Sequence, residues 1–262
     1  MSARASVLVP TRGSQSASRA AAILRLLSDE RRPLSLTQVA ARLDLAKSSA
    51  LAVLVSLEAS GLARKDEAGG YALGSGVVEL AGSFLQSFDV VSQFKHGVEE
   101  LPLLSREVVQ LATLVGTQVL FLARRAGRSP LGFSAMVGDR FPASITAVGN
   151  ALLASRPDAE VAELFSDPAD LPAWTGRSTR TLPELLDKLR LARERGYAVD
   201  EGETNPEVYG LAVRVRRGGR FSEDVAVGAA LRPFTVPRDH REAVLEELRC
   251  LRDRLESANV LT

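Results

Sequence analysis

The chain has 262 residues, of which 45% are hydrophobic and 25% charged, and its formal net charge is +1. This length suggests two domains or one large one, with enough chain to bury a sizeable core. One cysteine and two histidines exclude a disulfide framework and a cysteine-rich zinc module. We therefore expect no metal, no cofactor and a reducing, cytoplasmic compartment. No run of 18 apolar residues is present, so we expect no transmembrane helix.

The near-neutral total hides an uneven distribution of charge. Residues 1–75 carry ten basic and six acidic residues, a net charge of +4, whereas residues 76–262 carry 23 basic and 26 acidic ones, a net charge of −3. A small basic segment joined to a larger acidic one suits a nucleic-acid-binding module attached to a second domain. We place the hinge at Gly74-Ser75-Gly76 and interpret residues 1–15 as a frayed, disordered polar tail.

The segment from 16 to 75 has the pattern of three helices and a hairpin. Apolar residues recur at helical spacing over 18–27, 36–43 and 47–60. Ser35 and Gln38 have the spacing of a capping box at the start of the second helix. Two short alternating runs, 62–64 and 71–73, flank a glycine-rich turn and predict a β-hairpin. Together these elements predict a winged helix-turn-helix domain.

A domain of this kind binds DNA through its third helix, because the major groove of B-DNA admits one α-helix while the preceding helix rests on the backbone. The wing would contact flanking phosphates and set the register without reading the sequence. The expected DNA-binding residues are Thr37, Lys47, Ser48, Ser49, Arg64 and Lys65. The alternative is that the trihelical unit mediates only protein contacts.

The rest of the chain predicts an α+β domain. A linker helix is expected over 76–95 and the domain proper over 96–262, with a helix at 90–107 that Pro102 kinks or divides. A meander of strands with helices beside it implies an antiparallel sheet covered by helices. The expected strands are 108–115, 118–124, 130–136, 208–216 and 225–231, and the expected helices are 147–155, 158–165, 182–195 and 238–257.

Several stretches spread over the chain carry a family resemblance. They are residues 36–40, 45–49, 54–62 and 71–74 in the first domain, and 138–142, 146–154 and 195–200 with Glu203 in the second. In this order and spacing they resemble the isocitrate lyase regulator (IclR) family of bacterial transcription factors. The resemblance implies a winged helix, a linker helix that helps dimerisation, and a GAF-like effector-binding domain. Operator DNA, a small-molecule effector and a homodimer or homotetramer are the partners it implies.

Some positions depart from the family pattern. Leu51-Ala52 stand where the family often has His-Arg in the recognition helix, which removes an expected phosphate or base contact. Asn150 replaces a lysine after the pocket glycine, and Ala143-Ser144-Ile145 replace a Leu-His-Ala. A ligand-sensing or protein-interaction module with weakened DNA binding is therefore the alternative function.

The effector pocket is expected where loops converge on the helix at 147–155. The backbone N–H groups at a helix N-terminus favour an anion, which suits a small organic acid, and apolar side chains would form the walls. The expected effector-binding residues are Phe133, Met136, Ser144, Ile145, Thr146, Ala147, Asp200 and Glu203. Plain core positions for Phe133 and Met136, and helix caps for Ser144 and Thr146, are the alternatives.

Catalytic signals are weak, and we assign no catalytic residue and expect no enzyme. Residues 132–136 resemble a nucleophile elbow around Ser134 but lack its final glycine, and His96 and His240 have no spacing that pairs them. Asp200, Glu201 and Glu203 could bind a hard cation, but three carboxylates near a glycine are more typical of a solvated turn.

Overall fold

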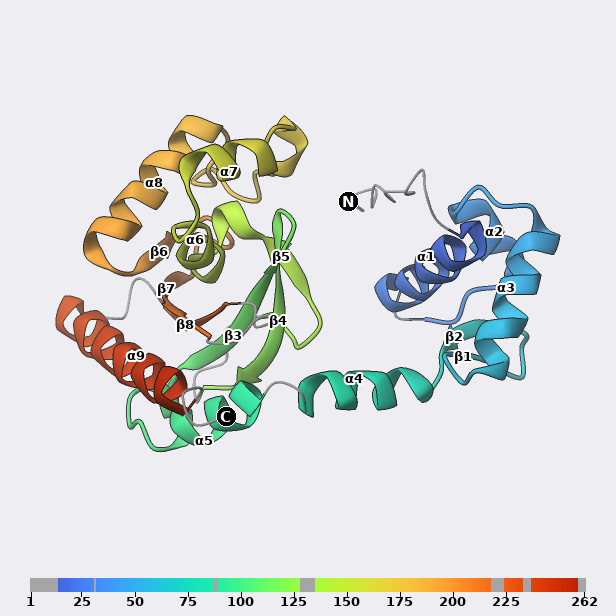
Figure 1. Cartoon of the computed structure of the whole chain (residues 1–262), viewed down its shortest axis with the longest axis horizontal. Coiled ribbons are helices and arrows are strands. Elements are labelled where there is room, and N and C mark those ends of the chain that lie inside the picture. The colour runs from blue at the N-terminus through green and yellow to red at the C-terminus, as the bar shows by residue number, and fades with distance from the viewer. Residues whose placement is uncertain are drawn as a thin grey trace. The chain divides into compact units, whose positions relative to one another are not determined.

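Figure 1 shows the computed structural model of the chain, which describes residues 14–30, 32–86, 89–127, 135–217, 224–232 and 237–258. The chain divides into two compact units, Met1–Ser87 and Phe88–Thr262. The hinge expected at Gly74–Gly76 lies between a hairpin and a helix of the first unit, and the division between the units follows that helix. In the part of the chain that is described, no helix is long and apolar enough to cross a membrane.

The first unit contains the three helices and the hairpin that the sequence predicts, followed by a fourth helix. The capping box is present: the Ser35 N–H donates to Gln38 Oε1 over 2.9 Å, and the Gln38 N–H donates to Ser35 Oγ over 3.3 Å. The elements are α1 (Gln15–Glu30), α2 (Leu36–Arg42), α3 (Lys47–Ala59), β1 (Ala63–Lys65), β2 (Tyr71–Leu73) and α4 (Gly76–Gln86).

A small aliphatic core holds the first three helices and the wing together. Helix α3 buries Ala50, Leu54 and Leu57 on one face, at the spacing of a single helical stripe. The opposite face of α3 stays exposed, which leaves it available to a partner. The buried members of this core are Ile23, Leu27, Leu34, Val39, Leu54, Leu57, Ala63 and Tyr71.

The wing is attached to the helices by an extra pair of backbone hydrogen bonds. Strands β1 and β2 are antiparallel, and Leu34, just before α2, pairs with Tyr71 through two bonds of 2.9 and 2.8 Å. The turn between the strands is closed by the Gly70 N–H, which donates to Asp66 Oδ1 over 2.7 Å. These contacts fix the wing relative to the pair α2–α3.

The second unit has the antiparallel sheet and helices that the sequence predicts. Helix α5 ends at Glu99 and a short 3-10 turn follows Pro102, so the expected division of this segment is present. Its helices are α5 (Asp89–Glu99), α6 (Ala147–Leu153), α7 (Asp158–Leu164), α8 (Leu182–Arg195) and α9 (Arg238–Ala258), and its 3-10 turns are η1 (Leu104–Arg106), η2 (Ala143–Ile145) and η3 (Pro168–Asp170). Its strands are β3 (Val108–Val115), β4 (Gln118–Arg125), β5 (Arg140–Pro142), β6 (Ala198–Glu201), β7 (Tyr209–Val215) and β8 (Val225–Leu231).

Two short edge strands were not expected from the sequence. The sheet order is β5-β4-β3-β8-β7-β6, so β5 and β6 close its two sides. Most of the strand expected at 130–136 lies outside the described residues, and Ala135 and Met136 are not in a strand. The outer position is instead taken by β5, which pairs with β4. A strand of three or four residues is too short to show a clear period of two.

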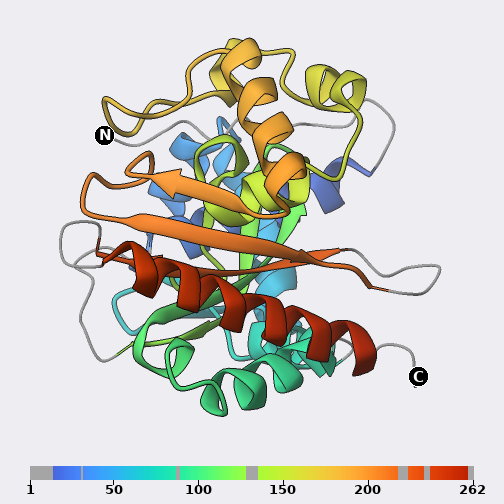
Figure 2. The same ribbon diagram turned by 90° about the vertical axis from the view of Figure 1, so that its left-hand side faces the viewer.

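Helices cover both faces of the sheet. Figures 1 and 2 show α9 along one face, where it contacts β7 and β8 beside α5, while α6 lies on the other face beneath α8. The sheet presents small residues to α6, among them Ala112, Ala212 and Ala226. A Cβ on Gly228 would lie only 2.8 Å from Val148 Cγ1, so the close approach of α6 requires glycine there. This close packing positions the start of α6 over the sheet.

Candidate functional site

The expected DNA-binding residues all lie on α2, α3 and the wing of the first unit. Thr37, Lys47, Ser48, Arg64 and Lys65 are exposed, and Ser49 is half-buried. Within the described part of this unit, the ion pairs of arginine involve Arg32 and Arg42, both with Glu30, whereas none involves Lys47, Arg64 or Lys65. The cations at the start of α3 and on the wing are therefore free to contact phosphates.

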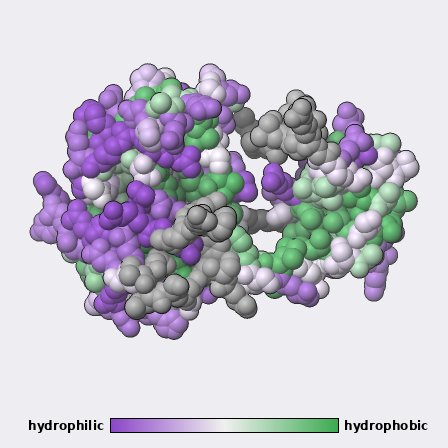
Figure 3. Space-filling model, in the orientation of Figure 1, coloured by the Kyte–Doolittle hydropathy of each residue, from purple (hydrophilic) through white to green (hydrophobic). Residues whose placement is uncertain are grey.

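The sequence did not show which side chains of α3 face outward beyond its first turn. In the structure the side chains of Leu51 and Val55 are 41% and 53% exposed, and Ala52 is exposed beside them. Hydrophobic residues are accordingly visible at the surface where α3 lies (Figure 3). The outer face of α3 is thus apolar after a basic start.

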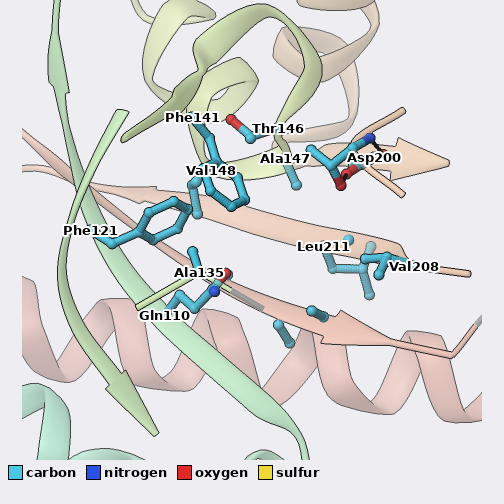
Figure 4. Close-up of a pocket in the computed structure, with 15 residues that line it drawn as sticks. Gln110, Phe121, Ala135, Phe141, Thr146, Ala147, Val148, Asp200, Val208 and Leu211 are labelled. Carbon is cyan, nitrogen blue, oxygen red and sulfur yellow. Dashed lines mark hydrogen bonds between the residues drawn. The ribbon is translucent and has the colours of Figure 1, made fainter. Parts of the chain in front are cut away.

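A pocket opens on the α6 side of the sheet in the second unit (Figure 4). Its apolar wall includes Phe121 and Phe141, whose rings meet edge to face with centroids 5.3 Å apart. Figure 4 shows these two rings on one side of the pocket and Asp200 on the other. The lining residues are Gln110, Phe121, Ala135, Phe141, Thr146, Ala147, Val148, Asp200, Thr204, Val208, Gly210, Leu211, Gly228, Ala229 and Ala230.

Asp200 is the carboxylate of this pocket, and it is buried. Burial raises the pKa of Asp200 to about 6, against the opposing effect of its hydrogen bonds. Its Oδ2 accepts from the Thr204 hydroxyl, and its Oδ1 accepts from the backbone N–H of Glu203 over 2.6 Å. Asp200 is therefore held by two hydrogen bonds on different oxygens, and its pKa lies well above the usual range of a carboxyl group.

A second buried carboxylate, Glu203, is held behind Asp200 by an ion pair. The Lys188 ammonium lies 2.7 Å from Glu203 Oε1 and also donates to the carbonyl oxygen of Ser144 and to the Thr179 hydroxyl, both over 2.8 Å. Burial lowers the pKa of Lys188, while the charge of Glu203 opposes this shift. The ammonium thus joins η2, the loop before α8 and the loop after β6, and the last of these lines the pocket through Thr204.

The structure brings together part of the expected effector set. Thr146, Ala147 and Asp200 line the pocket, and Glu203 supports Asp200 from behind. Thr146 also caps α6, since its Oγ1 accepts from the Gly149 N–H over 3.1 Å. Of the three carboxylates expected in a solvated turn, Glu201 is exposed, whereas Asp200 and Glu203 are buried, and Lys188 compensates the charge of Glu203.

The other expected members lie elsewhere. Met136 is 53% exposed and does not line the pocket, because the chain turns at Gly138 to enter β5. Ser144 and Ile145 are buried on η2 without lining it, since this turn packs against α6. Phe133 lies outside the described residues.

Several functional residues escaped the sequence analysis. Phe121 comes from β4, Phe141 comes from β5, a strand that the sequence pattern did not predict, and Lys188 is an ordinary lysine of an amphipathic helix. Gln110 alone carried a local signal, since it interrupts an apolar run in β3 with a polar side chain that faces the pocket.

The two histidines considered for catalysis lie in separate places in the described part of the chain. His240 Nε2 lies 3.2 Å from Glu107 Oε1, and His96 Nδ1 lies 2.9 Å from the carbonyl oxygen of Ser92 in its own helix. Ser134 lies outside the described residues. Among the residues that are described, no group of three His, Cys, Asp or Glu side chains is placed to hold a metal ion.

A winged helix with a basic edge, joined to a sheet domain with a pocket, defines a DNA-binding transcriptional regulator that carries a ligand-binding domain. The model of the IclR helix-turn-helix domain matches residues 16–67, and that of the bacterial transcriptional regulator IclR C-terminal domain matches residues 82–254. The chain belongs to the IclR family.

Two named regulators and one solved structure illustrate what this chain is similar to. The glycerol operon regulatory protein of Streptomyces griseus is 34% identical over 219 residues, covering 83% of this chain and 84% of the relative. The HTH-type transcriptional repressor AllR of Escherichia coli (strain K12) is 29% identical over 196 residues, covering 74% and 72%. An IclR homologue from Microbacterium hydrocarbonoxydans, crystallised with 4-hydroxybenzoate, has a TM-score of 0.80 at 23% identity, covering 95% and 100%. These relatives are named as regulators and not as enzymes.

Replacing Lys188 tests whether the buried ion pair holds the pocket. We expect Lys188→Met to lower the free energy of unfolding by about 3–5 kcal/mol, because it leaves the Glu203 carboxylate buried without its cation. The control is Arg190→Met on the same helix, whose pairs with Asp187 and Glu194 are exposed to solvent and contribute little to stability. Urea denaturation measures both, and equal losses in the two variants would contradict the assigned role.

The raised pKa of Asp200 predicts a pH-dependent stability. The folded protein holds this proton up to about pH 6, whereas the ordinary pKa is 3.8, so Asp200 costs increasing stability as the pH rises between these values. Asp200→Asn should therefore gain stability relative to the parent chain between pH 4 and pH 7, on the order of 3 kcal/mol. Denaturation at both pH values checks this, and a constant difference between the two proteins would rule it out.

Proposed function

We propose that this protein binds operator DNA as a dimer or a dimer of dimers, and that a small metabolite in the Asp200 pocket modulates this binding. The observation that carries the proposal is the union, in one chain, of a winged helix whose Lys47, Arg64 and Lys65 form no ion pair with the described residues and a second unit with a pocket. In this proposal the protein acts as a repressor or an activator of transcription.

The DNA-binding part of the proposal rests on charge and shape. Lys47 begins α3, where the first turn of a recognition helix meets the major groove. Arg64 and Lys65 on β1 would meet the flanking phosphates, and the Lys65 ammonium also lies 5.4 Å from the centre of the Tyr71 ring, within cation–π range. Thr37, Ser48 and Ser49 would add hydroxyl contacts to phosphates or base edges.

Helix α4 supports the homodimer. Val78 and Leu80 on this helix are 72% and 62% exposed, and because they are two residues apart they lie on different sides of it. A second copy of the chain that packed along α4 would cover one of these large aliphatic side chains. Because a symmetric dimer carries two recognition helices, its operator would be pseudo-palindromic, with half-sites about one helical turn apart.

The lining of the pocket favours, as its ligand, a small organic acid that also carries a hydroxyl or a protonated carboxyl group. The Phe121 and Phe141 rings would contact an apolar or aromatic body, and Thr146 and Gln110 are polar groups on the same lining. Asp200 would accept a hydrogen bond from the ligand, because two carboxylates can meet only when a proton lies between them. The homologue crystallised with 4-hydroxybenzoate suggests aromatic hydroxy acids as the first ligands to test.

The alternative is a ligand-sensing or protein-interaction module whose DNA binding is weak. Its support is the exposed pair Leu51-Ala52 on α3, where a basic pair would add affinity for phosphate. Duplex binding distinguishes the two functions.

Binding to the DNA upstream of the protein's own gene tests the proposal. We expect a sequence-selective mobility shift that weakens with salt, because phosphate contacts release counterions. Lys47→Ala should lower affinity similarly on all sequences and reduce the log–log salt slope by about one. The control is Lys95→Ala, which removes an exposed lysine of α5 in the other unit and should change neither quantity. A protein that shows no salt-sensitive, selective shift, with or without candidate acids, would favour the alternative function.

Thermal stabilisation tests the ligand part. A ligand that binds the native state raises the free energy of unfolding by about 2.7 kcal/mol at 100 times its Kd. We expect one or more small hydroxy acids, with 4-hydroxybenzoate in the panel, to raise the melting temperature of the parent chain. Asp200→Asn should lose this response while Asp187→Asn, at an exposed site on α8, keeps it. A response that survives in Asp200→Asn would place the ligand elsewhere.

A further inference from the structure

The outer face of α3 has a defined chemical character. Leu51 and Ala52 lie three and four residues after Ser48, and Val55 lies four and three residues after them, so all four lie on a single face of the helix. This face is opposite to Ala50, Leu54 and Leu57, which are packed in the core. All four side chains are exposed, Leu51 by 41% and Val55 by 53%.

This face has few groups that can hydrogen-bond to a base. Guanine is usually read by Arg or Lys, and adenine by Asn or Gln, through paired hydrogen bonds. After Lys47, α3 contains no residue of these four types. The Ser56 hydroxyl is already engaged, because it donates to the carbonyl oxygen of Ala52 over 3.1 Å. Helix α3 therefore cannot read guanine or adenine by the common bidentate contacts beyond its first residue.

Aliphatic side chains do recognise one feature of the major groove. Thymine presents its C5-methyl group there, and apolar side chains distinguish it from cytosine by contact with that methyl. The exposed carbons of Leu51, Ala52 and Val55 form a surface of this kind, and hydrophobic residues reach the surface where α3 lies (Figure 3). Burying one methyl group is worth about 0.8 kcal/mol.

The charges around this face favour duplex DNA as its occupant over a protein partner. Lys47 lies at the start of the same helix, and Arg64 and Lys65 lie on the adjoining wing; none of the three forms an ion pair within the described residues. Duplex DNA would neutralise these cations, which an apolar protein surface would not do.

We propose that Leu51, Ala52 and Val55 are specificity-determining residues that read thymine methyl groups in the operator half-site. Lys47, Arg64 and Lys65 then position the helix by contacts to phosphate, and the apolar face selects the sequence. The inference rests on the proposed DNA-binding function. It explains how a recognition helix without a basic pair in its middle can still be selective.

The experiment uses the full chain and a pool of random duplexes about 30 base pairs long, which is about three helical turns. Duplexes that the protein retains are sequenced, and each thymine of the best half-site is replaced in turn by deoxyuridine. Deoxyuridine keeps the hydrogen-bonding groups of thymine and lacks only the methyl. We expect thymines at the centre of the half-site, and a loss of affinity of about fourfold for each contacted methyl.

Variants assign the methyl contacts to named side chains. Leu51→Ala should weaken binding to the thymine duplex and abolish the effect of deoxyuridine at one position, and Val55→Ala should do so at another. Both sites are exposed, so the fold should persist, as the melting temperature will show. The matched control is Leu191→Ala, which truncates a leucine of similar exposure, 44%, in the other unit and should leave all affinities unchanged.

The outcomes separate this inference from the function on which it rests. If the protein selects a duplex but deoxyuridine changes no affinity, or changes it equally in Leu51→Ala and Val55→Ala, methyl recognition is wrong and operator binding stands. If the selected half-site is centred on guanine and cytosine, methyl recognition is also wrong. If the protein retains no duplex at all, both the inference and the proposed function fail.

Discussion

The buried ammonium of Lys188 holds together the segments on which the pocket depends. It binds the Glu203 carboxylate, the Ser144 carbonyl and the Thr179 hydroxyl, so three segments distant in sequence meet at one charge. A buried charge without its partner lowers the free energy of unfolding, so loss of either Lys188 or Glu203 would destabilise the whole arrangement. The backbone N–H of Glu203 in turn donates to Asp200, so the same ion pair sets the position of the pocket carboxylate. Any ligand that moves Asp200 therefore acts on a network that reaches α8 and η2.

The two units have different surfaces for binding: a pocket in the second unit and an exposed helix face in the first. In the second unit, small residues let α6 approach the sheet closely, and the pocket between them combines aromatic walls with a carboxyl of raised pKa. In the first unit, Lys47 precedes the apolar outer face of α3, and Arg64 and Lys65 lie on the wing that follows this helix. Affinity for DNA would then come mainly from phosphate contacts, and selectivity from contacts that carry no charge. Added salt would lower the affinity that comes from phosphate contacts and leave the selectivity that comes from uncharged contacts almost unchanged.

Much of the fold could be predicted from local patterns. The capping box at Ser35, the hydrophobic stripe of α3 and the apolar runs of β3 and β8 all lie where the sequence places them, since each is a repeating pattern with clear ends. The strands β5 and β6 were missed, because each is short and exists only through its neighbour in the sheet. The sequence did not predict that Asp200 and Glu203 are buried while Glu201 stays exposed, because the compensating cation, Lys188, comes from another element.

By itself, the sequence determined the order of the elements, the family and the difference in charge between the two halves of the chain, since these depend on local periodicity and residue counts. Tertiary structure alone decided which residues meet. It placed Phe121 and Phe141 opposite Asp200, set Lys188 against Glu203, and left Leu51 and Val55 exposed on the same helix that buries Leu54. Contacts between distant segments depend on how whole elements pack, and a linear pattern carries no measure of that packing. The charge difference between the two halves of the chain likewise gained a location only in the structure, which places Lys47 at the start of α3 and Arg64 and Lys65 on the wing.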